Sequence, residues 1–182
     1  MTCATALRAG WKGVADLALL PDIAATYRAP VRVQRAKIAA GSERLALAYL
    51  TIACALIFVG QWPVQARTAH LTGADLQQLL GASLMAWIFV APLLFYGLAL
   101  CIHWASRAVR RPVGSFAARM TLFWALLAAV PLWLLNGLTA AMMGDGPALL
   151  IVGLAAFGTF LVFWGAGLRA AREQVDLAPS TT

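Results

Sequence analysis

The sequence predicts an all-α, polytopic membrane protein with four transmembrane helices. Two observations predict this class. The chain of 182 residues is 62% hydrophobic and only 12% charged, with a mean hydropathy of +0.80, and its apolar residues gather into four long runs. Because charged residues make up about a quarter of an ordinary globular sequence, much of this apolar surface must face lipid.

Each apolar run is long enough to cross a membrane. At about 1.5 Å of rise per residue, a helix of about 20 residues spans a hydrocarbon layer of about 30 Å. We expect spans at residues 45–62, 79–104, 116–143 and 148–168. They form a transmembrane domain, 43–168, between a cytoplasmic or interfacial segment, 1–42, and a cytoplasmic tail, 169–182.

The N-terminal segment is too polar to be a span. Arg8, Lys12 and Asp16 recur every four residues and so share one helical face. That pattern is typical of an amphipathic helix lying in the headgroup plane. We expect Pro21 and Asp22 to end this helix, which leaves at most a short helical piece before Pro30.

Capping and turn residues mark the ends of the predicted spans. Ser42 is suited to the N-cap of the first span, and Pro63 to its end. Thr72 is a candidate cap for the second helix, with Asp75 in its first turn. The Gly-Asp-Gly-Pro sequence at 144–147 predicts a tight turn that makes the last two spans antiparallel.

Prolines, glycines and one amide are candidates for helix packing inside the membrane. Pro92 and Pro131 lie within the second and third spans, where each removes a backbone donor and predicts a kink or a local widening. Gly97 and Gly153 are small enough for close helix approach. Asn136, the most polar side chain of the third span, should bond to another helix or face a cavity. Both bent packing and an open vestibule fit these features, and we favour packing.

The basic residues gather on one side of the predicted membrane. Thirteen of the fourteen Lys and Arg residues precede the first span, lie around the loop between the second and third, or follow the fourth. Only Arg67 falls on the other side. By the positive-inside rule, this asymmetry predicts that both termini are cytoplasmic.

The basic segments are candidate surfaces for anionic lipid or a protein partner. Cations beside a span are attracted to lipid phosphates. Because they flank spans instead of lining a soluble recognition fold, a nucleic-acid partner is not expected. The alternative is that these cations only set orientation or cover a solvated face. The candidate residues are Arg32, Arg35, Lys37, Arg107, Arg110, Arg111 and Arg119.

The sequence offers little for catalysis or metal binding. Cys3, Cys54 and Cys101 lack the spacing of a metal site, and His70 and His103 are expected on opposite sides of the membrane. The spans also contain no carboxylate or lysine of the kind that ion relays usually require. We therefore expect no enzymatic activity, no cofactor and no metal ion.

Several stretches resemble one known family. Residues 118–132 read ARMTLFWALLAAVPL, 144–147 read GDGP, 163–169 read FWGAGLR, 22–30 read DIAATYRAP and 60–63 read GQWP. The pattern resembles the short, alphaproteobacterial branch of the Ypt-interacting-protein (Yip) domain family. The resemblance implies a scaffold in the bacterial cytoplasmic (inner) membrane with no catalytic residue. Eukaryotic relatives have five spans and engage small GTPases, whereas four spans are expected here.

The sequence thus predicts a protein that acts by binding. The leading hypothesis is a Yip-like scaffold or organiser that meets anionic lipids of the cytoplasmic leaflet and integral membrane partners, or other copies of itself. The alternative is an accessory subunit of a larger respiratory or photosynthetic complex. A small permease or channel that uses the kinks at Pro92 and Pro131 is a third possibility.

Overall fold

The computed structural model describes residues 19–40, 42–108 and 113–177, and all its elements in these ranges are helical. Four helical stretches are long and apolar enough to cross a membrane: Glu43–Thr72, Leu76–Ala108, Ser115–Met143 and Pro147–Gln174. This confirms the predicted fold class. In chain order the elements are α2 (Leu19–Arg28), α3 (Pro30–Ala40), α4 (Glu43–Thr72), α5 (Leu76–Met85), the π-helical turn η1 (Ala86–Val90), α6 (Ala91–Ala108), α7 (Ser115–Met143) and α8 (Pro147–Leu177).

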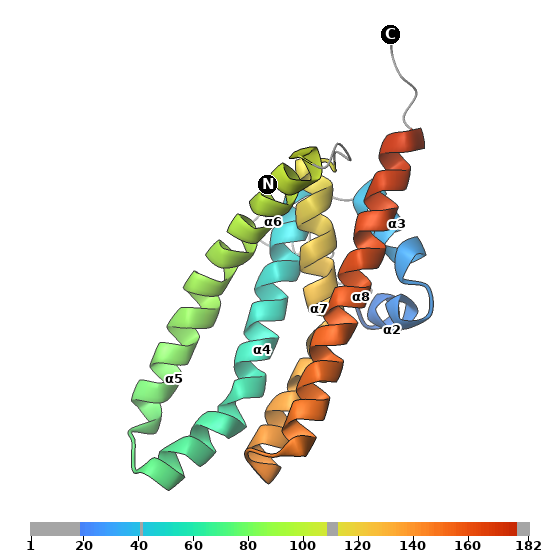
Figure 1. Ribbon diagram of the computed structural model, residues 1–182. Helices are drawn as coiled ribbons and strands as arrows, with labels where there is room; N and C mark the ends of the chain where they lie inside the picture. The colour runs from blue at the N-terminus through green and yellow to red at the C-terminus, as the bar shows by residue number, and fades with distance from the viewer. Residues whose placement is uncertain (1–18, 41, 109–112, 178–182) are drawn as a thin grey trace, which may run out of the picture.

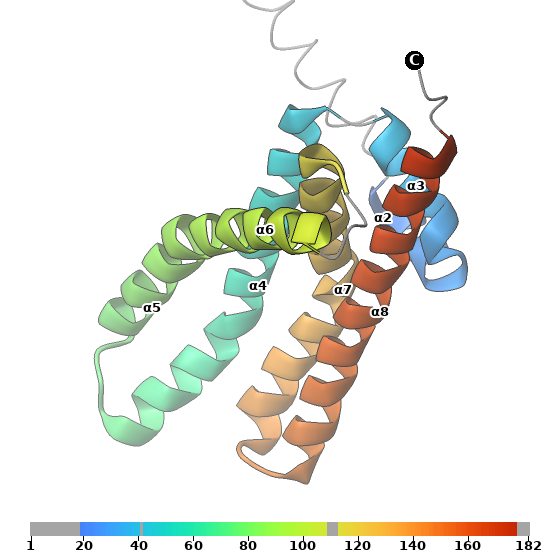
Figure 2. The same cartoon turned by 45° about the horizontal axis from the view of Figure 1, so that its top comes forward.

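The long helices run antiparallel as two hairpins (Figure 1). We call the end that holds the start of α4 and α7 and the end of α6 and α8 the basic end. The opposite end, with the loops at 73–75 and 144–146, is the turn end. Helices α4, α7 and α8 pack side by side, whereas α5 leans away from α7 and α8 toward the turn end in both views (Figure 2).

The first span is longer than predicted. Ser42 caps α4 as expected, since its hydroxyl accepts a hydrogen bond from the Leu45 N–H at 3.4 Å. The prediction that Pro63 ends the helix is wrong, because α4 continues through Pro63 to Thr72. Proline is tolerated inside membrane helices, and α4 changes direction toward the turn end (Figure 1). Most of the connection expected before the second span is therefore helix.

The start of the second span also differs from the prediction. Asp75, not Thr72, is its N-cap, with a carboxylate oxygen that accepts from the Gln77 N–H at 2.9 Å. Thr72 instead ends α4 and donates its hydroxyl to the Thr68 carbonyl at 2.8 Å. The local widening predicted around Pro92 is present as η1, the π-helical turn that ends two residues before it. The widened turn accommodates the proline without interrupting the span.

A tight turn joins α7 to α8, as predicted. Gly144 has a φ of 71°, which favours glycine, and its N–H closes the last turn of α7 on the Ala140 carbonyl. Arg67 from α4 donates to the Ala141 carbonyl at 2.8 Å. A cation thus satisfies a carbonyl at the C-terminus of α7, where the helix dipole favours positive charge.

The core lies in the basic half of the bundle. In α7, Ala118 and all residues of 120–130 are buried, whereas no residue from Pro131 to Met143 is. Tyr49 and Leu50 of α4 complete this core on one side. Helices α2 and α3 cover it on the other side, against α7 and α8.

The segment before the first span is more helical than predicted, with α2 and α3 in place of one short helical piece. Pro21 and Asp22 do not end a helix, because both lie inside α2. Pro30 begins α3, a position that suits its fixed φ. The amphipathic helix predicted before Leu19 lies outside the described residues.

Candidate lipid and partner interface

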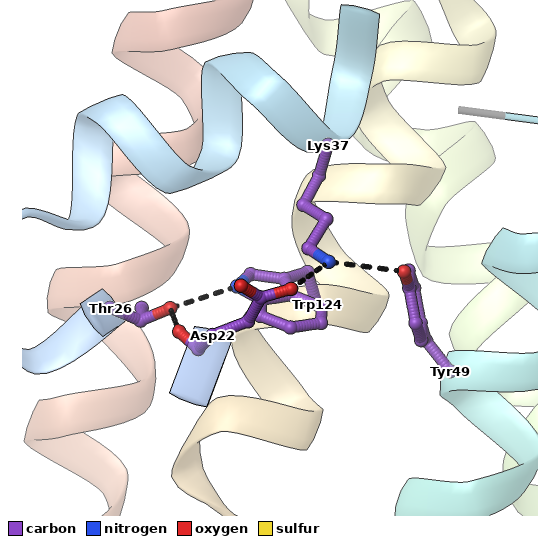
Figure 3. Close-up of polar contacts among 5 residues, drawn as sticks. All are labelled: Asp22, Thr26, Lys37, Tyr49 and Trp124. Atoms are coloured by element: carbon purple, nitrogen blue, oxygen red, sulfur yellow. Dashed lines mark hydrogen bonds and ion pairs between the residues drawn. The ribbon is translucent and has the colours of Figure 1, made fainter. Parts of the chain in front are cut away.

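A polar cluster holds α2 and α3 on the bundle. We call Asp22, Thr26, Lys37, Tyr49 and Trp124 the docking cluster. Figure 3 shows the Lys37 ammonium group between the Asp22 carboxylate and the Tyr49 hydroxyl, above the indole of Trp124. Four helices, α2, α3, α4 and α7, therefore meet at one lysine.

The geometry of the docking cluster satisfies each buried polar group in it. The Lys37 Nζ lies 2.5 Å from an Asp22 carboxylate oxygen, 3.3 Å from the Tyr49 Oη and 4.4 Å from the centroid of the Trp124 ring. The Trp124 Nε1–H donates to the Thr26 Oγ1 at 3.1 Å, and this hydroxyl donates to the Asp22 carbonyl at 2.7 Å. These bonds fix the position of both N-terminal helices.

Two more side chains tie the same helices to α7 and α8. The buried Gln34 amide donates to the carbonyls of Thr121 and Phe163, each at 3.4 Å. Tyr27 donates to the Ala128 carbonyl at 3.2 Å and packs edge-on against the Phe163 ring. Partial burial raises the pKa of the Tyr27 phenol from its ordinary value.

Three of the predicted lipid-binding cations have partners within the chain. Lys37 belongs to the docking cluster. Arg35 forms an ion pair with Glu173 of α8, and Arg119 forms one with Glu43 at the start of α4. These contacts give each residue a role in joining helices, which the sequence analysis did not anticipate.

Other cations at the basic end are exposed and form no ion pair with the described residues. Arg32 and Arg107 are predicted site residues of this kind, and Arg44 and Arg169 join them. Arg110 and Arg111 lie outside the described residues. The exposed guanidinium groups therefore leave the basic end strongly cationic, as anionic lipid binding requires.

The predicted packing residues fall in different environments. The Gly153 Cα lies so close to Asn136 that a Cβ added to it would sit 3.3 Å from the amide oxygen, which places both residues in the α7–α8 contact. That oxygen is buried and has no hydrogen-bond partner among the described residues. Gly97 has open space at its Cβ position, so it does not bring two helices together within the described chain. Pro131 is exposed within α7, and Pro92 follows η1.

The closest helix contact involves glycines that the sequence analysis did not single out. A Cβ on Gly137 of α7 would overlap the Gly60 carbonyl oxygen of α4. Gly167 of α8 likewise faces Thr121 and Gln34, and a Cβ there would lie 2.7 Å from the Thr121 Cβ. Small residues allow such backbone approach, but only the partner helix shows which glycines are used.

A cavity opens near the turn end among α4, α7 and α8. Its volume is about 540 Å³, and Gln61, Trp133, Asn136 and Asp145 supply its polar lining. Toward the basic end it stops near Ile57 and Trp133, beyond which the facing residues of α4 and α7 form the buried core. The cavity is thus a one-sided recess of the turn half.

The second span contributes least to the chain's own core. Of the apolar stretch that defines it, only 6% of residues are buried inside the chain, compared with 56% for α7. Its exposed side chains include Phe89, Leu93, Leu94 and Leu100. This face is left for lipid or for another membrane protein.

The fold places the chain in the class of multi-pass α-helical membrane proteins. Comparisons with models of known protein families, with curated proteins and with solved structures find no match to this chain. Its function is therefore inferred from its own surfaces.

Proposed function

We propose that this protein is a non-catalytic membrane scaffold of Yip-like type. It binds anionic lipid of the cytoplasmic leaflet at its basic end and an integral membrane partner, or a second copy, along α5, η1 and α6. The observation that carries the proposal is the contrast between a densely packed basic half and a second span that is only 6% buried. The packed core thereby leaves the apolar side chains of α5, η1 and α6 facing the surrounding membrane.

The polar groups of the described chain support binding over catalysis. The buried ones of the docking cluster are engaged in joining helices. The exposed arginines lie at the basic end, which by the positive-inside rule faces the cytoplasm of a bacterial inner membrane. The packing of α7 between Ala118 and Val130 also closes the recess at the turn end, which favours a scaffold over a permease.

A photo-cross-linking amino acid tests the partner face. At Leu94, which is exposed on α6, we expect a discrete protein adduct in native membranes. At Leu122, which is fully buried in α7, we expect none. Lipid adducts alone at Leu94 would contradict a protein partner on this face.

Extraction in a mild detergent separates the scaffold from the accessory-subunit alternative. A homo-oligomer or a lipid-rich particle supports the scaffold. Stoichiometric co-migration with a large respiratory or photosynthetic complex supports the alternative.

Reporter fusions test the orientation. An alkaline phosphatase reporter, active only outside the cytoplasm, should be silent after Val113 and after Thr182 and active within residues 68–77. Activity after Val113 would contradict the proposed orientation.

A further inference from the structure

A groove between α6 and α7 at the basic end has the lining of a binding site for an amphipathic molecule. Its volume is about 440 Å³. One face of α6 and the first turn and a half of α7 line it, since the α6 residues follow helical spacing. The residues that matter are Leu93, Gly97, Leu100, His103, Ser115 and Arg119.

The polarity of this groove changes along its length. His103, Ser115 and Arg119 lie at the basic end, near the start of α7 and toward the end of α6. Leu93 lies ten residues before His103, about 15 Å deeper along α6 at the rise of an α-helix. Leu93 is 73% exposed, so the deep part of the groove opens toward the hydrocarbon. A polar head therefore fits at the basic end and an acyl chain below it.

The polar end is suited to a phosphate. Arg119 is the only cation in the lining and keeps 27% of its side chain exposed although it pairs with Glu43. His103 is oriented by a bond from its Nδ1–H to the Val113 carbonyl at 2.9 Å, so Nε2 of the neutral ring is an acceptor and the donors for a phosphate come from Arg119 and Ser115. Gly114 provides no side-chain cap for α7, so N–H groups of its first turn have no side-chain cap among the described residues and face the groove end that holds the Ser115 hydroxyl.

The deep end is suited to a hydrocarbon chain. A Cβ added to Gly97 would meet nothing within 4 Å, so the groove is open at this residue. Leu93 and Leu100 flank the opening with apolar surface. Free phosphate makes no favourable contact with this apolar part of the groove, whereas a phospholipid occupies both the polar end and the apolar end.

We propose that this groove binds one anionic phospholipid of the cytoplasmic leaflet, with its phosphate beside Arg119 and Ser115 and one acyl chain along Gly97. The proposal rests on the lipid binding proposed above and gives it a specific site. It also explains why an arginine lies one turn inside the start of α7, in a helix that is otherwise apolar or neutral.

The test measures phosphatidylglycerol and phosphatidylcholine bound to the full chain, by native mass spectrometry from nanodiscs. The unaltered protein should prefer phosphatidylglycerol. Gly97→Leu places a side chain in the groove, where an added Cβ meets nothing within 4 Å, and should lower this binding about tenfold, the effect of losing roughly 1.4 kcal/mol of contacts. Gly158→Leu is the matched control, because Gly158 also has open space at its Cβ position but lies on α8, outside both the groove and the proposed partner face.

A second pair of variants separates a lipid contact of Arg119 from its ion pair with Glu43. Arg119→Gln should weaken phosphatidylglycerol binding, whereas Glu43→Gln should preserve or strengthen it because the guanidinium then loses its competing partner. Equal losses in both variants would show that the ion pair, not the lipid contact, is responsible, and would overturn the site. Inorganic phosphate should not displace the lipid, and full displacement would overturn the acyl-chain contact.

Different results would contradict the groove as the binding site and the wider proposal of anionic lipid binding. If the unaltered protein binds both lipids alike, the proposed anionic preference fails. If it prefers phosphatidylglycerol but Gly97→Leu binds as well as Gly158→Leu, with both variants unfolding at the same temperature, only the groove is overturned.

Discussion

The two halves of α7 are built differently. Toward the basic end the helix is enclosed on all sides by α2, α3, α4, α6 and α8, and its residues are buried from 120 to 130. From Pro131 onward none is buried, and a recess opens beside Trp133 and Asn136. The difference shows that apolar sequence alone does not determine what covers a membrane helix. Short polar helices cover one half, and the other half is left for lipid or a partner.

The largest expected effect compares a tryptophan in each half. Trp124→Ala removes a fully buried indole and the partner of Thr26, so we expect a loss of about 3–5 kcal/mol in the free energy of unfolding. Trp133→Ala should cost about 1–2 kcal/mol, because this side chain is only partly buried and its N–H has no described partner. Unfolding in detergent measures both. Equal losses would contradict the contrast between the halves.

In the turn half, α4 and α7 are in direct backbone contact, whereas in the basic half they pack through side chains. Gly137→Ala places a methyl group against the Gly60 carbonyl and should cost about 1–3 kcal/mol by forcing α4 and α7 apart. Gly158→Ala is the matched control, since its Cβ meets nothing within 4 Å. The same unfolding assay applies. A stable Gly137→Ala protein would show that the two helices separate easily.

Variants of the docking cluster measure how much it contributes to holding α2 and α3 on the bundle. Lys37→Met leaves Asp22 without its cation and should cost about 1–2 kcal/mol, as well as exposing α2 and α3 to protease. The double variant with Asp22→Asn should recover part of that loss, because neither charge is then unpaired. Arg32→Met, at an exposed residue of the same helix, should change nothing. A protease-resistant Lys37→Met protein would indicate that packing alone holds these helices.

The smallest effect is expected at the exposed end of the same interface. Arg35 and Glu173 pair where both side chains are about half exposed. Arg35→Gln should therefore cost at most about 0.5 kcal/mol, and raised salt should remove the difference. A larger loss that persists in high salt would mean that Arg35 contributes more than its ion pair.

The fold class and the α7–α8 turn follow from local sequence, because hydropathy, length and turn composition are properties of neighbouring residues. The packing of α2 and α3 does not follow in the same way. Asp22 and Lys37 are close in sequence, but Trp124 is about a hundred residues away. Its residue type alone does not show whether the tryptophan is buried in the fold or lies at the membrane interface.

The candidate sites also combine features that follow from local sequence with features that depend on tertiary packing. The cationic character of the basic end is visible in composition, whereas the pairing of Arg119 with Glu43 requires the helices to be placed. Gly97 and Gly137 are equally small, yet one lies beside open space and the other against a backbone carbonyl. Only tertiary structure separates a groove from a contact.

The long reach of the N-terminal helices has a consequence for biogenesis. Gln34 bonds to the carbonyl of Phe163, and Arg35 pairs with Glu173, so both contacts join residues near opposite ends of the chain. During synthesis, α2 and α3 emerge before α8. They can contact Tyr49 of α4 and Trp124 of α7 before α8 has been inserted, whereas the bonds to Phe163 and Glu173 form only afterwards. Insertion of α8 therefore completes the docking of α2 and α3.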